Sequence, residues 1–248
     1  MTKAIIIAAG LGSRLRPYTN NIPKILLKIK NKTILDRHLQ IFKSLNVKNI
    51  NMVVGYKKEK FKNGDLNYIE NKNYRNNNIL ESLFYAKSLM KDNCLISYSD
   101  IIFKKKIVKK LLKSKNSISV LVDTNWKKNY KGRTMHPISQ AENVFFDKKN
   151  NLIKVGKNLL ESESNGEFIG MLKINKVGCK LFKKYYYIAK KKYRNKPFYN
   201  AKNIKKAYLT DFFNFLISKK IKIKCVKVKN NWMEIDTVQD YKKARNFF

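Results

Sequence analysis

KAIIIAAGLGSRLRPYTNNIPKILLK, residues 3–28, is the stretch that decides the fold of this chain. Residues 4–9 are small or branched and apolar, a run typical of a parallel strand buried on both faces. Gly10, Gly12 and Ser13 follow as a turn. Because glycine leaves its backbone N–H uncovered, such a turn at a strand end offers several donors to phosphate oxygens.

Three cations accompany this turn. Arg14 and Arg16 follow it, and Lys24 closes the loop behind Pro23. Guanidinium and ammonium groups bind phosphate oxygens through charge-assisted hydrogen bonds. An ordinary turn with a solvated basic loop is the alternative, but the whole string favours a polyphosphate site. The string is neither a P-loop, which needs Gly-Lys-Ser/Thr, nor the dinucleotide motif Gly-x-Gly-x-x-Gly.

Size and composition bound the class of protein. The 248 residues, 44% of them hydrophobic, suit one α/β domain with a sizeable core. No apolar run reaches the roughly 18 residues of a membrane span, and no signal peptide is expected because the N-terminus enters a strand directly. The scattered cysteines Cys94, Cys179 and Cys225 fit a reducing, cytoplasmic compartment.

The net charge of +38 at pH 7 needs an explanation. A basic chain can bind nucleic acid or an anionic membrane surface. Here the excess is almost entirely Lys, spread along the chain among many Asn and Ile, which indicates the codon drift of an A/T-rich genome. We therefore expect no nucleic-acid partner, although a polyanion-binding role stays open. The field should attract nucleotides and phosphorylated substrates.

Alternating strand and helix patterns predict the fold. Strands are expected over 49–54, 93–99, 117–122, 167–174 and 221–228. Helices are expected over 33–45, 79–90, 177–193, 209–218 and 238–247. Strand-helix-strand units of this length form right-handed crossovers. We therefore predict an α/β protein, a Rossmann-like three-layer sandwich with a mostly parallel, mixed central sheet.

Two carboxylates stand where strands end. Asp100 follows the strand over 93–99, and Asp236 lies at a strand-to-helix junction near the C-terminus. Ligands of open α/β sheets bind at the carboxyl ends of strands. Mg²⁺ is usually held by one or two carboxylates together with phosphate oxygens. We therefore predict that Asp100 and Asp236 hold Mg²⁺ against the polyphosphate, with helix capping as the alternative for each.

The segment 123–142 shows no periodicity. An irregular stretch of this length in a compact domain is more often a functional loop than filler. It mixes Trp126, Tyr130, Arg133 and His136. We interpret it as a functional loop.

The loop motif Gly-x-Gly-x-Arg-Leu-Arg-Pro-x-Thr-x-x-x-Pro-Lys-x-Leu, residues 10–26, resembles the sugar-phosphate nucleotidylyltransferase superfamily. The resemblance implies a nucleotidyltransferase, GT-A-like fold in which this loop wraps an NTP triphosphate. The nucleotide contacts it implies are Ala8, Ala9, Gly10, Gly12, Ser13, Arg14, Lys24, Asn78 and Ser82. For Asn78 and Ser82, a cap or loop role is the equal alternative.

Further motifs resemble two cytidylyltransferase branches. The Asn-rich segment 71–78 and EIDTVQDYKKA (234–244) resemble phosphocholine cytidylyltransferases. YKGRTMHPISQAE (130–142), GEFIGMLKI (166–174) and AYLTDFF (207–213) resemble 2-aminoethylphosphonate cytidylyltransferases. The family usually has Gly-Asp where this chain has Ser99-Asp100, which keeps the carboxylate in place.

This resemblance implies a reaction and its residues. CTP would bind in an N-terminal half (about 1–122), and a small phosphonate such as 2-aminoethylphosphonate, or a phospho-amine, in an acceptor half (123–248). The acceptor oxygen would attack the α-phosphorus and release pyrophosphate, without a general base. The implied catalytic residues are Arg14, Lys24 and Lys157. The implied acceptor residues are Trp126, Tyr130, Arg133, His136, Glu142, Glu167 and Asp211. For each of them, loop packing or surface charge is the equal alternative.

Other functions stay open at this stage. A phosphocholine cytidylyltransferase is the nearest alternative, followed by a sugar-1-phosphate nucleotidylyltransferase. A basic nucleic-acid-binding protein without catalysis is more distant, because the phosphate loop and both acidic positions are intact. The sequence also leaves open the exact acceptor, the nucleobase and a homodimer.

Overall fold

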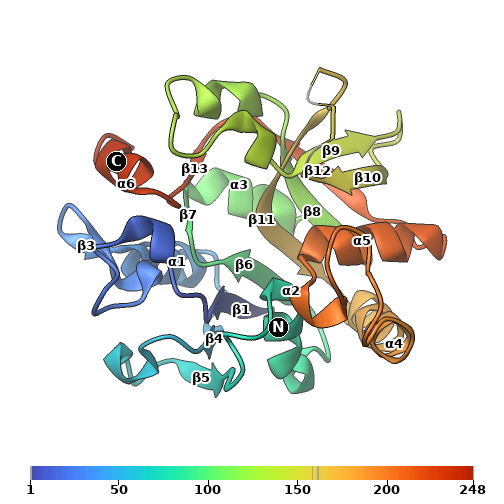
Figure 1. The fold of residues 1–248 in the computed structure, drawn as a ribbon, viewed down its shortest axis with the longest axis horizontal. Coiled ribbons are helices and arrows are strands. Elements are labelled where there is room, and N and C mark those ends of the chain that lie inside the picture. The colour runs from blue at the N-terminus through green and yellow to red at the C-terminus, as the bar shows by residue number, and fades with distance from the viewer. Residues whose placement is uncertain (1, 158, 161, 248) are drawn as a thin grey trace.

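The computed structural model describes residues 2–157, 159–160 and 162–247. Within them a nine-stranded mixed sheet forms the centre (Figure 1). Its strands are β1 (Lys3–Ala8), β4 (Asn49–Val54), β5 (Asn67–Glu70), β6 (Cys94–Tyr98), β8 (Ile118–Asp123), β9 (Asn143–Phe146), β10 (Leu152–Gly156), β11 (Gly166–Ile174) and β12 (Lys224–Val228). Its helices are α1 (Ile34–Ser44), α2 (Ile79–Tyr85), α3 (Lys105–Leu112), α4 (Lys176–Lys192), α5 (Leu209–Ser218) and α6 (Val238–Ala244).

The sheet order is β10-β9-β11-β6-β1-β4-β5, with β8 paired to β11 and β12 paired to β8. Parallel pairing joins β1 to β4 and β6, β4 to β5, and β12 to β8. Strand β11 runs antiparallel to both β6 and β8. The predicted mixed α/β sheet is therefore confirmed, with β1 near its middle.

The apolar run of β1 is buried because helices cover both faces of the sheet. Ala4, Ile6 and Ala8 lie in a core with residues of α1, α3 and α6. Ile5 and Ile7 point the other way, into a core with residues of α2, α4 and α5. In Figure 1, α1 and α4 accordingly lie on opposite sides of β1. The alternation of neighbouring side chains across the strand produces the three layers.

Several predicted elements are shorter than expected, among them one helix and one strand whose ends have a clear cause. The helix expected over 79–90 ends at Tyr85, because Ala86 N–H bonds to Leu83 O and the chain tightens into a 3₁₀ turn. The strand expected over 221–228 starts only at Lys224, because the N–H of Ile221 still closes the end of α5 by bonding to Leu216 O. No helix among the described residues has the length and apolarity needed to cross a membrane.

A small antiparallel sheet joins β7 (Ile101–Phe103) to β13 (Trp232–Glu234). Strands β2 (Lys28–Ile29) and β3 (Lys32–Thr33) form another two-stranded sheet. Ile101 pairs with Glu234, and the N–H of Ile235 donates to Asp100 O at 2.7 Å. This pairing brings Asp100 and Asp236 to the same edge.

Helix α6 begins directly after Asp236. Thr237 is its N-cap: the Thr237 side chain accepts from Asp240 N–H, and the Asp240 carboxylate accepts from Thr237 N–H. This reciprocal cap satisfies the first helical N–H groups. The carboxylate of Asp236 is therefore not needed as a cap and can face the site.

Strand β11 contains a position that only glycine suits. Its register with β8 shifts between Phe168 and Leu172. Gly170, within this shift, has φ of +76°, and an added Cβ would lie 2.5 Å from Cδ2 of Tyr98.

We predict that Gly170→Ala lowers the free energy of unfolding by about 1–3 kcal/mol through backbone strain and overpacking. Urea denaturation measures the change. Gly64→Ala is the control, because a Cβ there meets open space, and it should change stability by less than about 0.5 kcal/mol. Equal stability of the two variants would contradict the assignment of strain at Gly170.

Candidate active site

Two adjoining cavities open at the carboxyl ends of β1 and β6. The first, here the loop cavity, has a volume of about 360 Å³ and is lined by residues 7–14, Lys24 and the start of α2. The second, here the acidic cavity, has about 300 Å³ and contains Glu142, Glu167 and Glu234 in its lining. Both cavities share a boundary made by Gly10, Arg14, Lys24, Asn78, Ile79, Asp100 and Asp236.

Lys24 lies between the two strand-end carboxylates. Its Nζ is 3.1 Å from Asp100 Oδ2 and 2.9 Å from Asp236 Oδ1. Burial would lower the pKa of Lys24, but Asp100 and Asp236 outweigh it and raise that pKa above its ordinary value. Burial likewise opposes ionisation of Asp236, but Lys24, His136 and Arg14 hold the pKa of this carboxyl far below its usual range. Lys24 and Asp236 are therefore both charged near neutral pH.

The two carboxylates fit a divalent cation. Both converge on the point that Lys24 Nζ now takes, and Asp100 Oδ1 is buried without a hydrogen-bond partner in the described chain. An unpartnered buried carboxylate oxygen is costly. Oxygen donors without sulfur favour a hard metal ion. The structure thus brings together the two predicted metal ligands.

The glycine loop is shaped around Lys24 and Thr19. The Thr19 hydroxyl donates to Gly12 O at 2.8 Å. Gly12 has φ of +61°, and a Cβ there would lie 3.3 Å from the Cβ of Lys24. The predicted contacts from Ala8 to Arg14 line the loop cavity, and Arg14, with a half-exposed side chain, pairs with Asp236.

Asn78 and Ser82 line the loop cavity but also have partners within the protein. Asn78 caps α2, accepting from Ile79 N–H and donating to Lys206 O. The Ser82 hydroxyl lies 2.9 Å from Asn71 Nδ2. Capping and ligand contact are thus compatible at these positions. Tyr74, Arg75 and Asn77 line the same cavity; sequence reasoning passed over them, although they belong to the Asn-rich segment.

Glu142 and Glu167 are two of the acidic-cavity residues whose carboxyl pKa values are raised. Burial in the cavity raises the pKa of Glu142 to about 8, with Lys157 opposing the shift. Burial also raises the pKa of Glu167 well above its usual value; Glu167 accepts a hydrogen bond from Tyr130, and its Oε2 has none from the described residues. Lys157 Nζ lies 3.4 Å from Gln140 Oε1. The aromatic residues of the lining are Tyr98, Phe168, Tyr208 and Trp232.

Several residues predicted to bind the acceptor lie outside the linings found for the two cavities. Trp126 and Tyr130 pack with Ala141 in a small separate core. Asp211 accepts N–H bonds from Tyr208 and Asn200 at the start of α5. These contacts give Trp126 and Asp211 structural roles, and Tyr130 reaches the acidic cavity only through its bond to Glu167.

Arg133 forms ion pairs with carboxylates of the C-terminal segment. Its Nε and Nη2 donate to the two oxygens of Asp240 at 2.7 and 2.9 Å, and Nη2 also reaches Glu234 Oε2 at 3.0 Å. Its side chain is 6% exposed. Direct binding of a phosphonate by Arg133 therefore requires these bonds to break, and the arrangement favours a bracing role.

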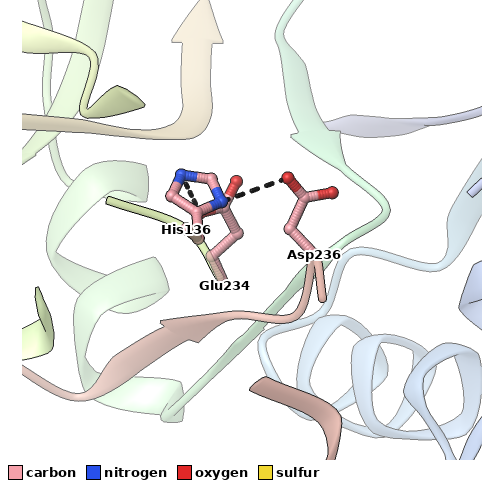
Figure 2. Close-up of side chains that lie close together, drawn as sticks. All are labelled: His136, Glu234 and Asp236. Atoms are coloured by element: carbon pink, nitrogen blue, oxygen red, sulfur yellow. Dashed lines mark ion pairs between the residues drawn. The ribbon is translucent and has the colours of Figure 1, made fainter. Parts of the chain in front are cut away.

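His136 lies between two carboxylates (Figure 2). Its Nδ1 is 3.3 Å from Asp236 Oδ2, and its Nε2 is 3.5 Å from Glu234 Oε2. One ligand atom from each of the three residues falls within a span of 4.8 Å. His136, predicted to bind the acceptor, thus contacts the predicted metal ligand Asp236 and is not among the residues found to line the acidic cavity.

The comparisons with known proteins agree with this geometry. Residues 4–155 match the family described as MobA-like NTP transferase domain. The chain belongs to this family. It is therefore a nucleotidyltransferase, as the loop motif indicated.

Several relatives of this nucleotidyltransferase are named cytidylyltransferases. The CTP:phosphoglutamine cytidylyltransferase of Campylobacter jejuni is 33% identical over 251 residues, covering 96% of each chain. A 2-aminoethylphosphonate cytidylyltransferase of Lancefieldella rimae is 33% identical over 36% of this chain and 38% of its own. The solved CTP:phosphocholine cytidylyltransferase of Streptococcus pneumoniae shares the fold, with a TM-score of 0.72, 20% identity and coverage of 98% and 97%. The predicted resemblance to cytidylyltransferases is confirmed.

Sequence reasoning missed Glu234 as a residue of this nucleotidyltransferase's site. It lines the acidic cavity, and burial followed by repulsion from Asp236 raises its pKa. The signal was present, because residues two apart in a strand point to the same side and Glu234 precedes Asp236 by two. Gln140 and Tyr208 also line this cavity and had no comparable local signal.

We predict that Arg133→Ala lowers the free energy of unfolding by about 3–5 kcal/mol, because Asp240 and Glu234 lose their buried cation. Urea denaturation measures the loss. Lys58→Ala removes the exposed Lys58–Glu70 pair and, as the control, should cost at most about 1 kcal/mol. A raised acceptor KM with wild-type stability would contradict the bracing role and support direct acceptor binding.

Proposed function

We propose that this enzyme transfers CMP from CTP to a small phosphonate or phosphate that carries a cationic amine, and releases pyrophosphate. The observation that carries the proposal is the pair Asp100 and Asp236 around Lys24, at the boundary shared by both cavities. A two-substrate transfer needs its reacting groups to meet at such a boundary.

The loop cavity suits the triphosphate of CTP. Backbone N–H groups of residues 10–13 and the side chains of Arg14 and Lys24 surround it with donors and positive charge. Cytosine specificity is supported by the cytidylyltransferase relatives. Asn78 and Ser82 lie where nucleoside contacts are expected.

Asp100 and Asp236 would hold Mg²⁺. When bound, the ion would neutralise charge on the triphosphate as pyrophosphate leaves. Lys24 would then leave the carboxylates and pair with phosphate, since the Lys24 residue lines both cavities. The place of Lys24 Nζ, within 3.1 Å of an oxygen of each carboxylate, supports this exchange.

The chemical step needs no general base from the protein. An ionised phosphonate or phosphate oxygen attacks the α-phosphorus of CTP, a new P–O bond forms, and the bond to pyrophosphate breaks. The enzyme contributes positioning and charge neutralisation. Lys157 in the acidic cavity and Arg14 at the boundary are the cations placed to hold the incoming group.

The acidic cavity suits an ammonium group. Glu142 and Glu167 supply carboxyl groups, and Tyr208 and Trp232 supply aromatic faces that attract cations. The 2-aminoethylphosphonate predicted from the sequence carries such a group. Phosphoglutamine carries one as an amino acid, and the full-length match to its cytidylyltransferase favours it as the first acceptor to test. A sugar phosphate carries none.

We predict that pyrophosphate is released from CTP with phosphoglutamine or 2-aminoethylphosphonate at least about tenfold faster, in kcat/KM, than with glucose-1-phosphate, since a buried ionic contact of about 1.4 kcal/mol is tenfold. A coupled pyrophosphate assay over four nucleotides and these acceptors plus phosphocholine measures it. Turnover with the sugar phosphate alone would contradict the proposal.

We also predict a pH dependence from Glu142. Below its pKa of about 8 the carboxyl of Glu142 is protonated and neutral, and above it the carboxylate attracts the acceptor ammonium. The acceptor KM should therefore fall about tenfold between pH 7 and pH 9. The acceptor itself also titrates in this range. Dividing the wild-type KM at each pH by the KM of Glu142→Gln at the same pH removes that contribution. If the acceptor KM of the wild type and of Glu142→Gln changed with pH in parallel, Glu142 would not be the group that binds the ammonium.

A further inference from the structure

The loop 123–142 is docked against α6. The N–H groups of Thr134 and Met135 donate to Gln239 Oε1 at 2.9 and 3.1 Å, beside the Arg133–Asp240 pair. These contacts hold the three residues that directly precede His136, whose own side chain is 3% exposed. The imidazole is therefore held against the C-terminal carboxylates and does not move freely.

The contacts of Asp236 divide between its two oxygens. Oδ1 faces Lys24 at 2.9 Å, on the side of Asp100. Oδ2 faces His136 Nδ1 at 3.3 Å, and Arg14 as well (Figure 2 shows the histidine contact). A rotation of this carboxylate would give up both sets of contacts. The imidazole thus helps to fix the plane of the carboxylate, with one oxygen directed toward Asp100.

The cluster of His136, Glu234 and Asp236 could instead hold a metal ion itself. Its spacing would permit this, but guanidinium groups already lie on the oxygens involved. Arg133 reaches Glu234 Oε2 at 3.0 Å, and Arg14 pairs with Asp236 Oδ2. By contrast, Asp100 forms its ion pair with Lys24 and with no guanidinium among the described residues. Hydrogen bonds do not separate the two places, because Asp100 Oδ1, Asp236 Oδ2 and His136 Nδ1 all lack one within the described chain. The charges therefore favour an ion between Asp100 and Asp236, with His136 behind it.

We propose that His136 is a positioning residue: the contact of its Nδ1 with one oxygen of Asp236 fixes the plane of the carboxylate, so that the other oxygen faces Asp100 and the metal. This inference rests on the metal pair of the proposed function. Groups that orient metal-binding carboxylates commonly affect metal affinity by about 10- to 100-fold. The loop 123–142 of the acceptor half would thereby influence the affinity of the site for the metal.

Two substitutions separate the nitrogens of His136. His136→Asn keeps an amide N–H near the place of Nδ1, and His136→Gln keeps one near Nε2. With the α,β-methylene analogue of CTP bound, Mn²⁺ affinity is measured by electron paramagnetic resonance. We expect His136→Gln to weaken Mn²⁺ binding about 10- to 100-fold and His136→Asn to stay within about threefold of wild type. In turnover, the metal activation constant should rise while kcat at saturating Mg²⁺ changes little.

Controls distinguish the possible failures. Equal Mn²⁺ affinity in all three proteins would overturn the role of His136, and so would an equal loss in both variants with lowered unfolding midpoints, which a purely structural residue predicts. Coupling of an imidazole nitrogen to bound Mn²⁺ would also overturn it, because His136 would then be a ligand. Asp100→Ala is measured alongside: unchanged Mn²⁺ binding there would contradict the proposed metal pair itself.

Discussion

The site depends on one electrostatic constraint: Asp100 and Asp236 share the single ammonium of Lys24. Buried ion pairs contribute little net stability, because desolvation offsets most of the attraction. In this arrangement Asp100 Oδ1 and Asp236 Oδ2 are buried atoms without a hydrogen-bond partner among the described residues. It is therefore better explained by ligand binding than by folding. The strand pair β7–β13 maintains it by fixing the two acidic positions side by side.

The strongly positive net charge of the whole chain gives no indication that carboxylates are concentrated at the site. Only 17 residues are acidic in a protein of net charge +38. Six of these carboxylates surround the site or brace it: Asp100, Glu142, Glu167, Glu234, Asp236 and Asp240. A general drift toward lysine explains the surface without explaining this concentration of carboxylates. Anionic substrates would thus meet a positive field outside and a few specific carboxylates within.

Local sequence signals predicted what depends on neighbours in the chain. The buried run of β1, the glycine turn and the strand-end position of Asp100 each follow from a few consecutive residues, and the structure places them as expected. The roles of Arg133 and Trp126 could not be predicted this way. Their partners come from distant segments, so the same residue types fit ligand binding and packing equally well until the loop is seen on α6.

The central claim is that Lys24 gives up its place between the carboxylates when metal and CTP bind. Anomalous diffraction from crystals with Mn²⁺ and the α,β-methylene analogue of CTP tests it directly. The account predicts a Mn²⁺ peak between Asp100 and Asp236, with Lys24 Nζ moved to the phosphates. A Mn²⁺ peak elsewhere, with Lys24 still bridging Asp100 and Asp236, would contradict it.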